Sequence, residues 1–155
     1  MLQQAQFAKD DTTARAMLAE VIENGKALDK LLDMVASQGG DSNQLKHIEL
    51  LPQAAYTMDI PAKQTGYIHE IHALALGKLA MRLGAGRMRL EDTIDPAVGI
   101  VLHKKCADYV REGEILATIH TQKELSKEWL ADFHAAYTIR QTAISKSPLI
   151  YKIIM

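Results

Sequence analysis

The sequence contains little cysteine, few aromatic side chains and no long apolar run. Cys106 is the single cysteine among 155 residues, which excludes an intramolecular disulfide and a cysteine-rich zinc site. No apolar stretch approaches the roughly 18–20 residues that cross a bilayer. The N-terminal MLQQAQFAKDD lacks the apolar core of a signal peptide. We therefore expect a cytoplasmic protein without a membrane partner.

An excess of charge of one sign is also missing. The chain has 18 Lys and Arg against 19 Asp and Glu, so its charge gives no reason to expect nucleic acid as a partner. Hydrophobic residues make up 48% of the chain and charged residues 24%, as in globular proteins. This length is sufficient for one domain, or for a small domain together with part of another.

The first part of the chain predicts helix. Between residues 11 and 36, apolar side chains recur at spacings of three and four, which is the pattern of an amphipathic helix. The Asp and Thr side chains at residues 10–12 can cap its start. Asn24-Gly25 interrupts the pattern and favours two helices that meet at a turn. We assign residues 1–37 to a helical segment.

A linker is predicted next, at residues 38–53. The stretch QGGDSNQLKHIELLPQ contains two adjacent glycines and a proline near its end, and these residues interrupt regular structure. Such a composition marks a domain boundary. A second domain is therefore expected over residues 54–155.

The second domain alternates short strands with helices. Strands are predicted at 55–62, 66–72, 97–103, 114–120, 138–144 and 149–155, with a helix at 73–83 and a turn at 108–113. TQKE at 121–124 is a capping box. It predicts a further helix that starts at Thr121 and places Leu125, Trp129 and Phe133 on one face. Strands separated by single helices favour an α+β fold.

Two motifs are candidates for metal binding or covalent chemistry. His69 and His72 lie three residues apart in a predicted strand, where they occupy opposite faces, whereas a zinc-protease motif needs two histidines at i and i+4 on a helix. Cys106 follows two lysines, and cationic neighbours favour a reactive thiolate, but the sequence assembles no triad around it. We assign no metal site and interpret Cys106 as structural.

The stretch LGAGRMRLEDTIDPAVG, residues 83–99, is the candidate functional loop. Its glycines follow a predicted helix, whose C-terminal end repels anions, whereas a phosphate cradle uses the N–H groups at a helix start. Gly84 suits the left-handed position that follows a helix. Glu91, Asp92 and Asp95 are able to bind a cation or act as acid and base, or to fix the turn by hydrogen bonds. We favour a turn.

Several motifs of the chain resemble one enzyme family. They are LGAGR followed by ED-x-ID-x-AVGI, the DYVREGEILATIH stretch, the upstream NGKALDKLLDMVASQGGD and LPQA, and the terminal LIYKIIM. In this order they resemble the C-terminal third of the pyrimidine-nucleoside phosphorylases, the group that includes thymidine phosphorylase. The resemblance covers nearly the whole chain and implies that the helical residues 1–37 form the end of the family's central α/β domain. Met1 need not be the start of the parent protein.

The resemblance implies both a fold and a reaction. Residues of about 54–155 are expected to form an α/β-hammerhead, a flattened barrel-sandwich of strands crossed by a helix. The parent enzyme is expected to be a pentosyltransferase that converts a pyrimidine nucleoside and phosphate into free base and (deoxy)ribose 1-phosphate. Phosphate is then a co-substrate, no cofactor is expected, and the parent is expected to be a homodimer through a helical domain that lies outside this chain.

The family's substrate-binding signatures are missing from the sequence. Neither a K-x-S-x-G-G phosphate stretch nor an S-G-R-G-L-x-H segment occurs, so no catalytic, cofactor-binding or metal-binding residue is assigned. The chain alone is expected to be inactive. The resemblance places the loop with Gly84, Gly86, Arg87 and Asp92 at the edge of the active-site cleft, where it would help closure. The alternative is that Arg87 only braces its own domain.

One position departs from the family pattern. The family usually has glycine before the aspartate of K-x-G-D-x-V, and this chain has Ala107 before Asp108. If the backbone there requires a positive φ, Ala107 is strained or the turn differs.

Two other interpretations remain open. VGIVLHKKCADYVREGEILATI resembles the hairpins of biotinyl and lipoyl carrier domains, but the nearest candidate for the carrier lysine, Lys123, is predicted in the first turn of a helix. The other interpretation is an interaction module. The apolar face of residues 12–36 must be buried against something, and we expect the isolated chain to self-associate through it.

Overall fold

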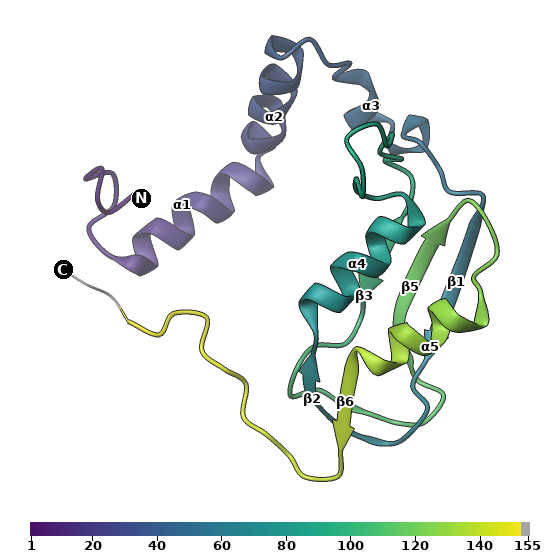
Figure 1. Ribbon diagram of the computed structural model, residues 1–155. Helices are drawn as coiled ribbons and strands as arrows, with labels where there is room; N and C mark the ends of the chain where they lie inside the picture. Colours follow the sequence, from purple (N-terminus) through teal and green to yellow (C-terminus); the bar gives the residue numbers. More distant parts are fainter. Residues whose placement is uncertain (153–155) are drawn as a thin grey trace. The chain divides into compact units, whose positions relative to one another are not determined.

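The computed structural model describes residues 1–152, and the chain separates into two units between Leu51 and Pro52 (Figure 1). The first unit is helical. It contains α1 (Asp11–Glu23), α2 (Lys26–Ser37), α3 (Asn43–Lys46) and the 3-10 helix η1 (Ile48–Leu50). The last two elements lie inside the segment 38–53 that the sequence predicted as a linker.

The long helical segment at residues 11–36 is divided in two. The Asp10 carboxylate caps α1 by accepting the Thr13 N–H at 2.7 Å. Gly25 has a φ of 82° and turns the chain between α1 and α2, a conformation that glycine adopts without a Cβ clash. No residue of α1 or α2 is buried. Their exposed large apolar side chains are Leu18, Ile22, Leu28, Leu31 and Met34.

Two three-stranded antiparallel sheets form the second unit, together with two helices. The first sheet has the order β1–β5–β3, with β1 (Tyr56–Pro61), β5 (Ile115–Thr121) and β3 (Gly99–Leu102). The second has the order β4–β2–β6, with β4 (Tyr109–Val110), β2 (Gly66–Ile71) and β6 (Tyr137–Arg140). The helices are α4 (Ala73–Leu83) and α5 (Lys127–Ala135). This mixed architecture is consistent with the predicted α+β class.

The core of the second unit takes side chains from both sheets and both helices. Ile68 of β2, Ile119 of β5 and Phe133 of α5 are fully buried within one cluster. The rings of Trp129 and Phe133 stack with their centroids 5.8 Å apart, and the Trp129 indole N–H donates to the Leu79 carbonyl at 3.4 Å. These contacts hold α5 against α4, and burial of each large side chain contributes about 1.5–3 kcal/mol.

The predicted start of the last helix is wrong. Thr121 ends β5, where it pairs with Tyr56, and α5 begins at Lys127 with Ser126 as its cap. The Ser126 hydroxyl accepts the Trp129 N–H at 3.1 Å. Two hydroxyl residues were thus available as caps, and pairing with β1 kept the first of them in the sheet. The predicted buried face with Trp129 and Phe133 is confirmed.

Most other elements follow the prediction, with bounds that are unchanged or differ at their ends. The helix at 73–83 is confirmed without change. The predicted turn at 108–113 contains the short strand β4, which pairs with β2 through Gly66 and Val110. Residues 149–152 of the predicted final strand form no strand, and 153–155 lie outside the described residues. No helix within residues 1–152 is long and apolar enough to cross a membrane.

Candidate functional site

The candidate loop starts where α4 ends. Gly84 has a φ of 109°, and its N–H donates to the Met81 carbonyl at 3.0 Å, while the Ala85 N–H donates to the Ala80 carbonyl at 3.0 Å. This pair of bonds is a Schellman motif, which satisfies the last carbonyls of a helix and favours glycine at the left-handed residue. The expected role of Gly84 in turning the chain is therefore supported by its geometry.

Gly86 is required by a close approach. A Cβ built on Gly86 would lie 2.9 Å from Cγ of Met81, a distance that would force the methionine side chain to shift. Gly84 and Gly86 thus serve different purposes in one turn, since the first permits a left-handed backbone and the second permits packing. Both glycines follow the C-terminal end of α4, which carries a partial negative charge and disfavours an anion.

Two aspartates brace the rest of the loop. One carboxylate oxygen of Asp92 accepts the N–H groups of Met88 at 2.9 Å and Arg89 at 2.8 Å. The Asp95 carboxylate accepts the Ala97 N–H at 2.9 Å and, through its other oxygen, the Gln122 side-chain amide at 2.9 Å. The acidic cluster therefore does what the turn interpretation expected of it, because its hydrogen bonds fix the backbone.

An open cavity of about 500 Å³ lies beside this loop. Three of the four candidate residues, Gly84, Gly86 and Asp92, line it, and Arg82 and Lys123 add two cationic side chains. Arg87 is exposed, is not among the lining residues, and its side chain makes no hydrogen bond or ion pair within residues 1–152. The structure thus gathers the loop candidates around one cavity and leaves Arg87 available for another partner.

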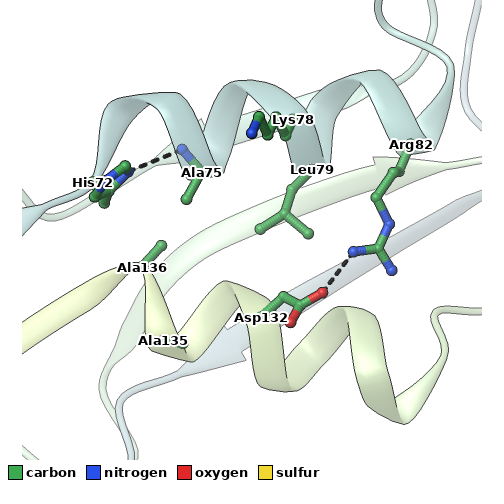
Figure 2. Close-up of a pocket in the computed structure, with 8 residues that line it drawn as sticks. All are labelled: His72, Ala75, Lys78, Leu79, Arg82, Asp132, Ala135 and Ala136. Atoms are coloured by element: carbon green, nitrogen blue, oxygen red, sulfur yellow. Dashed lines mark hydrogen bonds and ion pairs between the residues drawn. The ribbon is translucent and has the colours of Figure 1, made fainter. Parts of the chain in front are cut away.

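A second cavity, of about 340 Å³, lies between α4 and α5. Figure 2 shows Arg82 reaching from α4 toward Asp132 on α5, with Leu79 pointing into the space between the helices. The Arg82 Nη1 and Asp132 Oδ2 atoms are 2.6 Å apart, in a pair whose side chains are 35% and 49% exposed. Such a pair contributes about 1 kcal/mol or less. Its role is to orient Arg82, which lines both cavities.

Arg82 and Lys123 line the cavity beside the loop but were not among the loop candidates drawn from the sequence. Arg82 lies in the last turn of α4, where a basic side chain is favoured by the helix dipole, so its position carried a weak signal. Lys123 lies in the bend between β5 and α5, so its predicted place in the first turn of a helix is wrong. Its contribution to the cavity depends on the long-range arrangement of the bend and the loop.

The two histidines of the HEIH motif have separate structural roles. His69 bonds through Nε2 to the Thr142 carbonyl at 2.6 Å. His72 caps α4, because its Nδ1 accepts the Ala75 N–H at 3.1 Å. Within residues 1–152, no group of three or more His, Cys, Asp and Glu side chains is arranged to hold a metal ion.

Cys106 is exposed in the turn before β4. One of its lysine neighbours, Lys104, is paired with Glu114 across the hairpin, and this pairing holds the pKa of Glu114 below its ordinary value. Glu114 also accepts the Arg111 N–H. The cationic charge near Cys106 is thus partly engaged elsewhere, and the surroundings of the thiol contain no assembled nucleophilic site among the described residues.

Comparison with known proteins identifies relatives of the chain. Residues 67–140 match the family model described as the pyrimidine nucleoside phosphorylase C-terminal domain. The pyrimidine-nucleoside phosphorylase of Bacillus subtilis is 48% identical over 135 residues, which cover 87% of this chain and 31% of that enzyme. An enzyme of the same name from Staphylococcus aureus is 44% identical over 141 residues, which cover 91% of this chain and 32% of the relative. The chain spans about a third of the length of these relatives.

Proposed function

The chain is a C-terminal portion of the pyrimidine-nucleoside phosphorylase family, and we propose that it is the C-terminal domain of such an enzyme. The full enzyme would transfer the pentosyl group of a pyrimidine nucleoside to phosphate in cytoplasmic nucleoside salvage. The observation that carries this proposal is 48% and 44% identity to two such enzymes along most of the chain. The two small antiparallel sheets and the helices packed with them support the further proposal of an α/β-hammerhead fold.

In this proposal the domain closes the cleft and contributes no catalytic group. The loop at Gly84–Asp92 forms the cleft edge, with its backbone braced by Asp92 and its exposed Arg87 directed to an acidic group of the preceding domain. Such a loop is suited to cleft closure, because hydrogen bonds already fix its backbone and the unpaired Arg87 can bind its partner without a rearrangement of the loop. Nucleoside and phosphate are bound by the parts of the enzyme outside this chain.

The first unit supports a separate expectation about assembly. Ile22 is 70% exposed and Leu18 is 51% exposed, which leaves apolar surface that water disfavours. In the parent homodimer this surface is covered by the preceding domain, and in the isolated chain residues 12–36 associate with a second copy. Light scattering across a concentration series checks this, and a monomer at high concentration contradicts it.

The proposed activity is tested by an ultraviolet assay of thymidine and uridine cleavage. The chain alone, with its fold checked by circular dichroism, is expected to release no base. A chimera that joins the preceding part of the Bacillus subtilis relative to this chain is expected to release base only when phosphate is present. Phosphate-dependent release by the chain alone contradicts the assignment of the chemistry to the missing parts, and an inactive folded chimera contradicts the family role.

The cleft role is tested by Arg87→Ala in the same chimera. Loss of one charge-assisted bond of about 1.5 kcal/mol made on closure predicts roughly a tenfold lower kcat/KM. Arg111→Ala is the matched control, since Arg111 is also exposed but lies in the turn between β4 and β5. Unchanged kcat and KM for Arg87→Ala would mean that this arginine serves only its own domain.

A further inference from the structure

The segment that follows β6 is fixed to the second sheet where it starts. The Gln141 side-chain amide donates to the Thr65 carbonyl at 2.8 Å, and Nε2 of His69 donates to the Thr142 carbonyl at 2.6 Å. Thr65 lies in the β1–β2 connection and His69 lies in β2. The polypeptide therefore leaves β6 along a defined path and is not a frayed strand end.

An ion pair is the last contact on this path. Nζ of Lys146 lies 3.0 Å from the carboxylate of Asp108, in the turn before β4. The same carboxylate accepts the Lys105 N–H at 2.8 Å, so the acceptor is itself held in place. Such a pair contributes little free energy, but it directs the chain that follows. In Figure 1 that chain leaves the second unit at the end opposite to the candidate loop.

Beyond the ion pair, the chain exposes large apolar side chains. Leu149 is 100% exposed, Ile150 is 69% exposed and Tyr151 is 80% exposed. Residues 147–152 form neither helix nor strand, and they make no hydrogen bond or ion pair with the rest of residues 1–152. Within the described chain, their side chains and their backbone groups are both without partners.

The composition of this segment is that of a strand. Pro148 is followed by LIYKIIM in the sequence, and β-branched and aromatic residues favour strands. Segments that stay solvated have low hydrophobicity, whereas an exposed apolar segment with high strand propensity promotes aggregation. Residues 147–152 therefore have the properties of a strand whose partner is outside the described chain.

The remainder of the proposed enzyme is favoured as this partner over a second copy. The chain covers only 31% and 32% of two relatives, so most of such an enzyme lies outside it. A partner in the same polypeptide acts at an effective concentration of about millimolar. A second copy must first lose its translational and rotational freedom, so docking within one enzyme molecule is the more favourable of the two.

We propose that residues 147–152 dock as an added strand on an open sheet edge in the part of the enzyme that precedes this chain. Added strands bond through their backbone groups and place alternate side chains in pockets, so Leu149 and Tyr151 would share one apolar groove. The proposal rests on the proposed function, because it requires the remainder of a phosphorylase. It adds an attachment of the second unit at the end opposite to the Gly84–Asp92 loop.

The test measures amide hydrogen exchange of residues 147–152 by mass spectrometry, in the isolated chain and in the chimera with the preceding part of the Bacillus subtilis relative. Exchange is expected at the unprotected rate in the isolated chain and at least about tenfold more slowly in the chimera, as for paired strand amides. Leu149→Ser combined with Tyr151→Ser is expected to restore fast exchange in the chimera. Leu74→Ser is the matched control, because Leu74 is 65% exposed on α4, and it should leave the protection unchanged.

Equal exchange in the chimera and in the isolated chain overturns the proposal, as does protection that the double substitution leaves intact. Protection that rises with the concentration of the isolated chain shows pairing with a second copy and also overturns it. Phosphate-dependent base release by the same chimera reports on the proposed function separately. An active chimera without protection refutes the docking alone, whereas an inactive chimera with protection contradicts the family role and retains the docking. If this chimera does not fold, a chimera with the Staphylococcus aureus relative gives the same comparison.

Discussion

Ala107 occupies a backbone conformation that favours glycine. Its φ is 71°, and it is the third residue of a turn closed by the Asp108 N–H and the Lys105 carbonyl at 3.1 Å. The Ala107 N–H donates to the Ile68 carbonyl at 2.8 Å, so β2 fixes the turn from outside. We expect Ala107→Gly to stabilise the second unit, because a left-handed backbone costs an L-residue roughly 1–2 kcal/mol.

The magnitude follows from three opposing contributions. Removal of the left-handed strain stabilises the folded state, while the extra freedom of glycine in the unfolded chain costs about 0.4–1 kcal/mol. Ala107 is only half-buried, so loss of its methyl group removes part of the roughly 0.8 kcal/mol of a buried methylene. At the middle of these ranges the net gain is about 0.4 kcal/mol, which corresponds to about 2–3 °C in Tm for a domain of this size.

The turn that contains Ala107 is held at neutral pH by the carboxylate of Asp108. The Asp108 carboxylate accepts the Lys105 N–H at 2.8 Å and pairs with Lys146 at 3.0 Å. These two interactions, the Lys105 bond first, hold the pKa of Asp108 below its ordinary value. Asp108 therefore stays ionised at neutral pH, and its bonds hold the backbone of Ala107 in the left-handed region.

Trp129 provides the assay, since it is the single tryptophan and is buried in the core of the second unit. Its fluorescence is followed during thermal and urea unfolding of the full chain, which isolates this unit from α1 and α2. Ala131→Gly on α5 is the control, because glycine in an exposed helix is expected to cost about 1 kcal/mol. A Tm for Ala107→Gly at or below that of the parent would refute the strain argument.

Two further predictions concern α5. Ser126→Ala should destabilise the second unit by about 1 kcal/mol, because it removes the side chain that caps α5. Glu124→Ala, at the position of the predicted capping box, should leave the free energy of unfolding unchanged. Equal losses of stability for the two variants in urea unfolding would contradict the assignment of the cap to Ser126. The pKa of His134 should lie below 6.5, because burial and then the charge of Lys63 lower it, and it should rise in Lys63→Gln. As pH falls, His134 is then protonated in the unfolded chain before it is protonated in the folded chain, so the free energy of unfolding falls as pH drops through 6.5. An NMR titration that gives a His134 pKa at or above 6.5 in the folded chain would contradict this.

Local patterns predicted much of the secondary structure. The helix at 73–83 is bounded by its composition and by Gly84, and the division at Asn24-Gly25 depends on a residue that tolerates a positive φ. The strain expected if Ala107 required a positive φ also needed no knowledge of tertiary contacts. These features were predictable because a few neighbouring residues determine them, and the family motifs in the sequence were sufficient to identify the relatives.

Other features depended on contacts between residues distant in the sequence. Thr121 has the sequence of a helix cap, but pairing with Tyr56 keeps it in β5, and β4 exists only because Val110 pairs with Gly66. Lys63 and Tyr137 line one cavity although they lie more than 70 positions apart. Sequence periodicity carries no information on such pairs, because the free energy that decides them comes from strand pairing and burial in the assembled fold. The sequence by itself therefore determined the family and the local turns, and the tertiary structure decided the strand ends, the caps and the cavities.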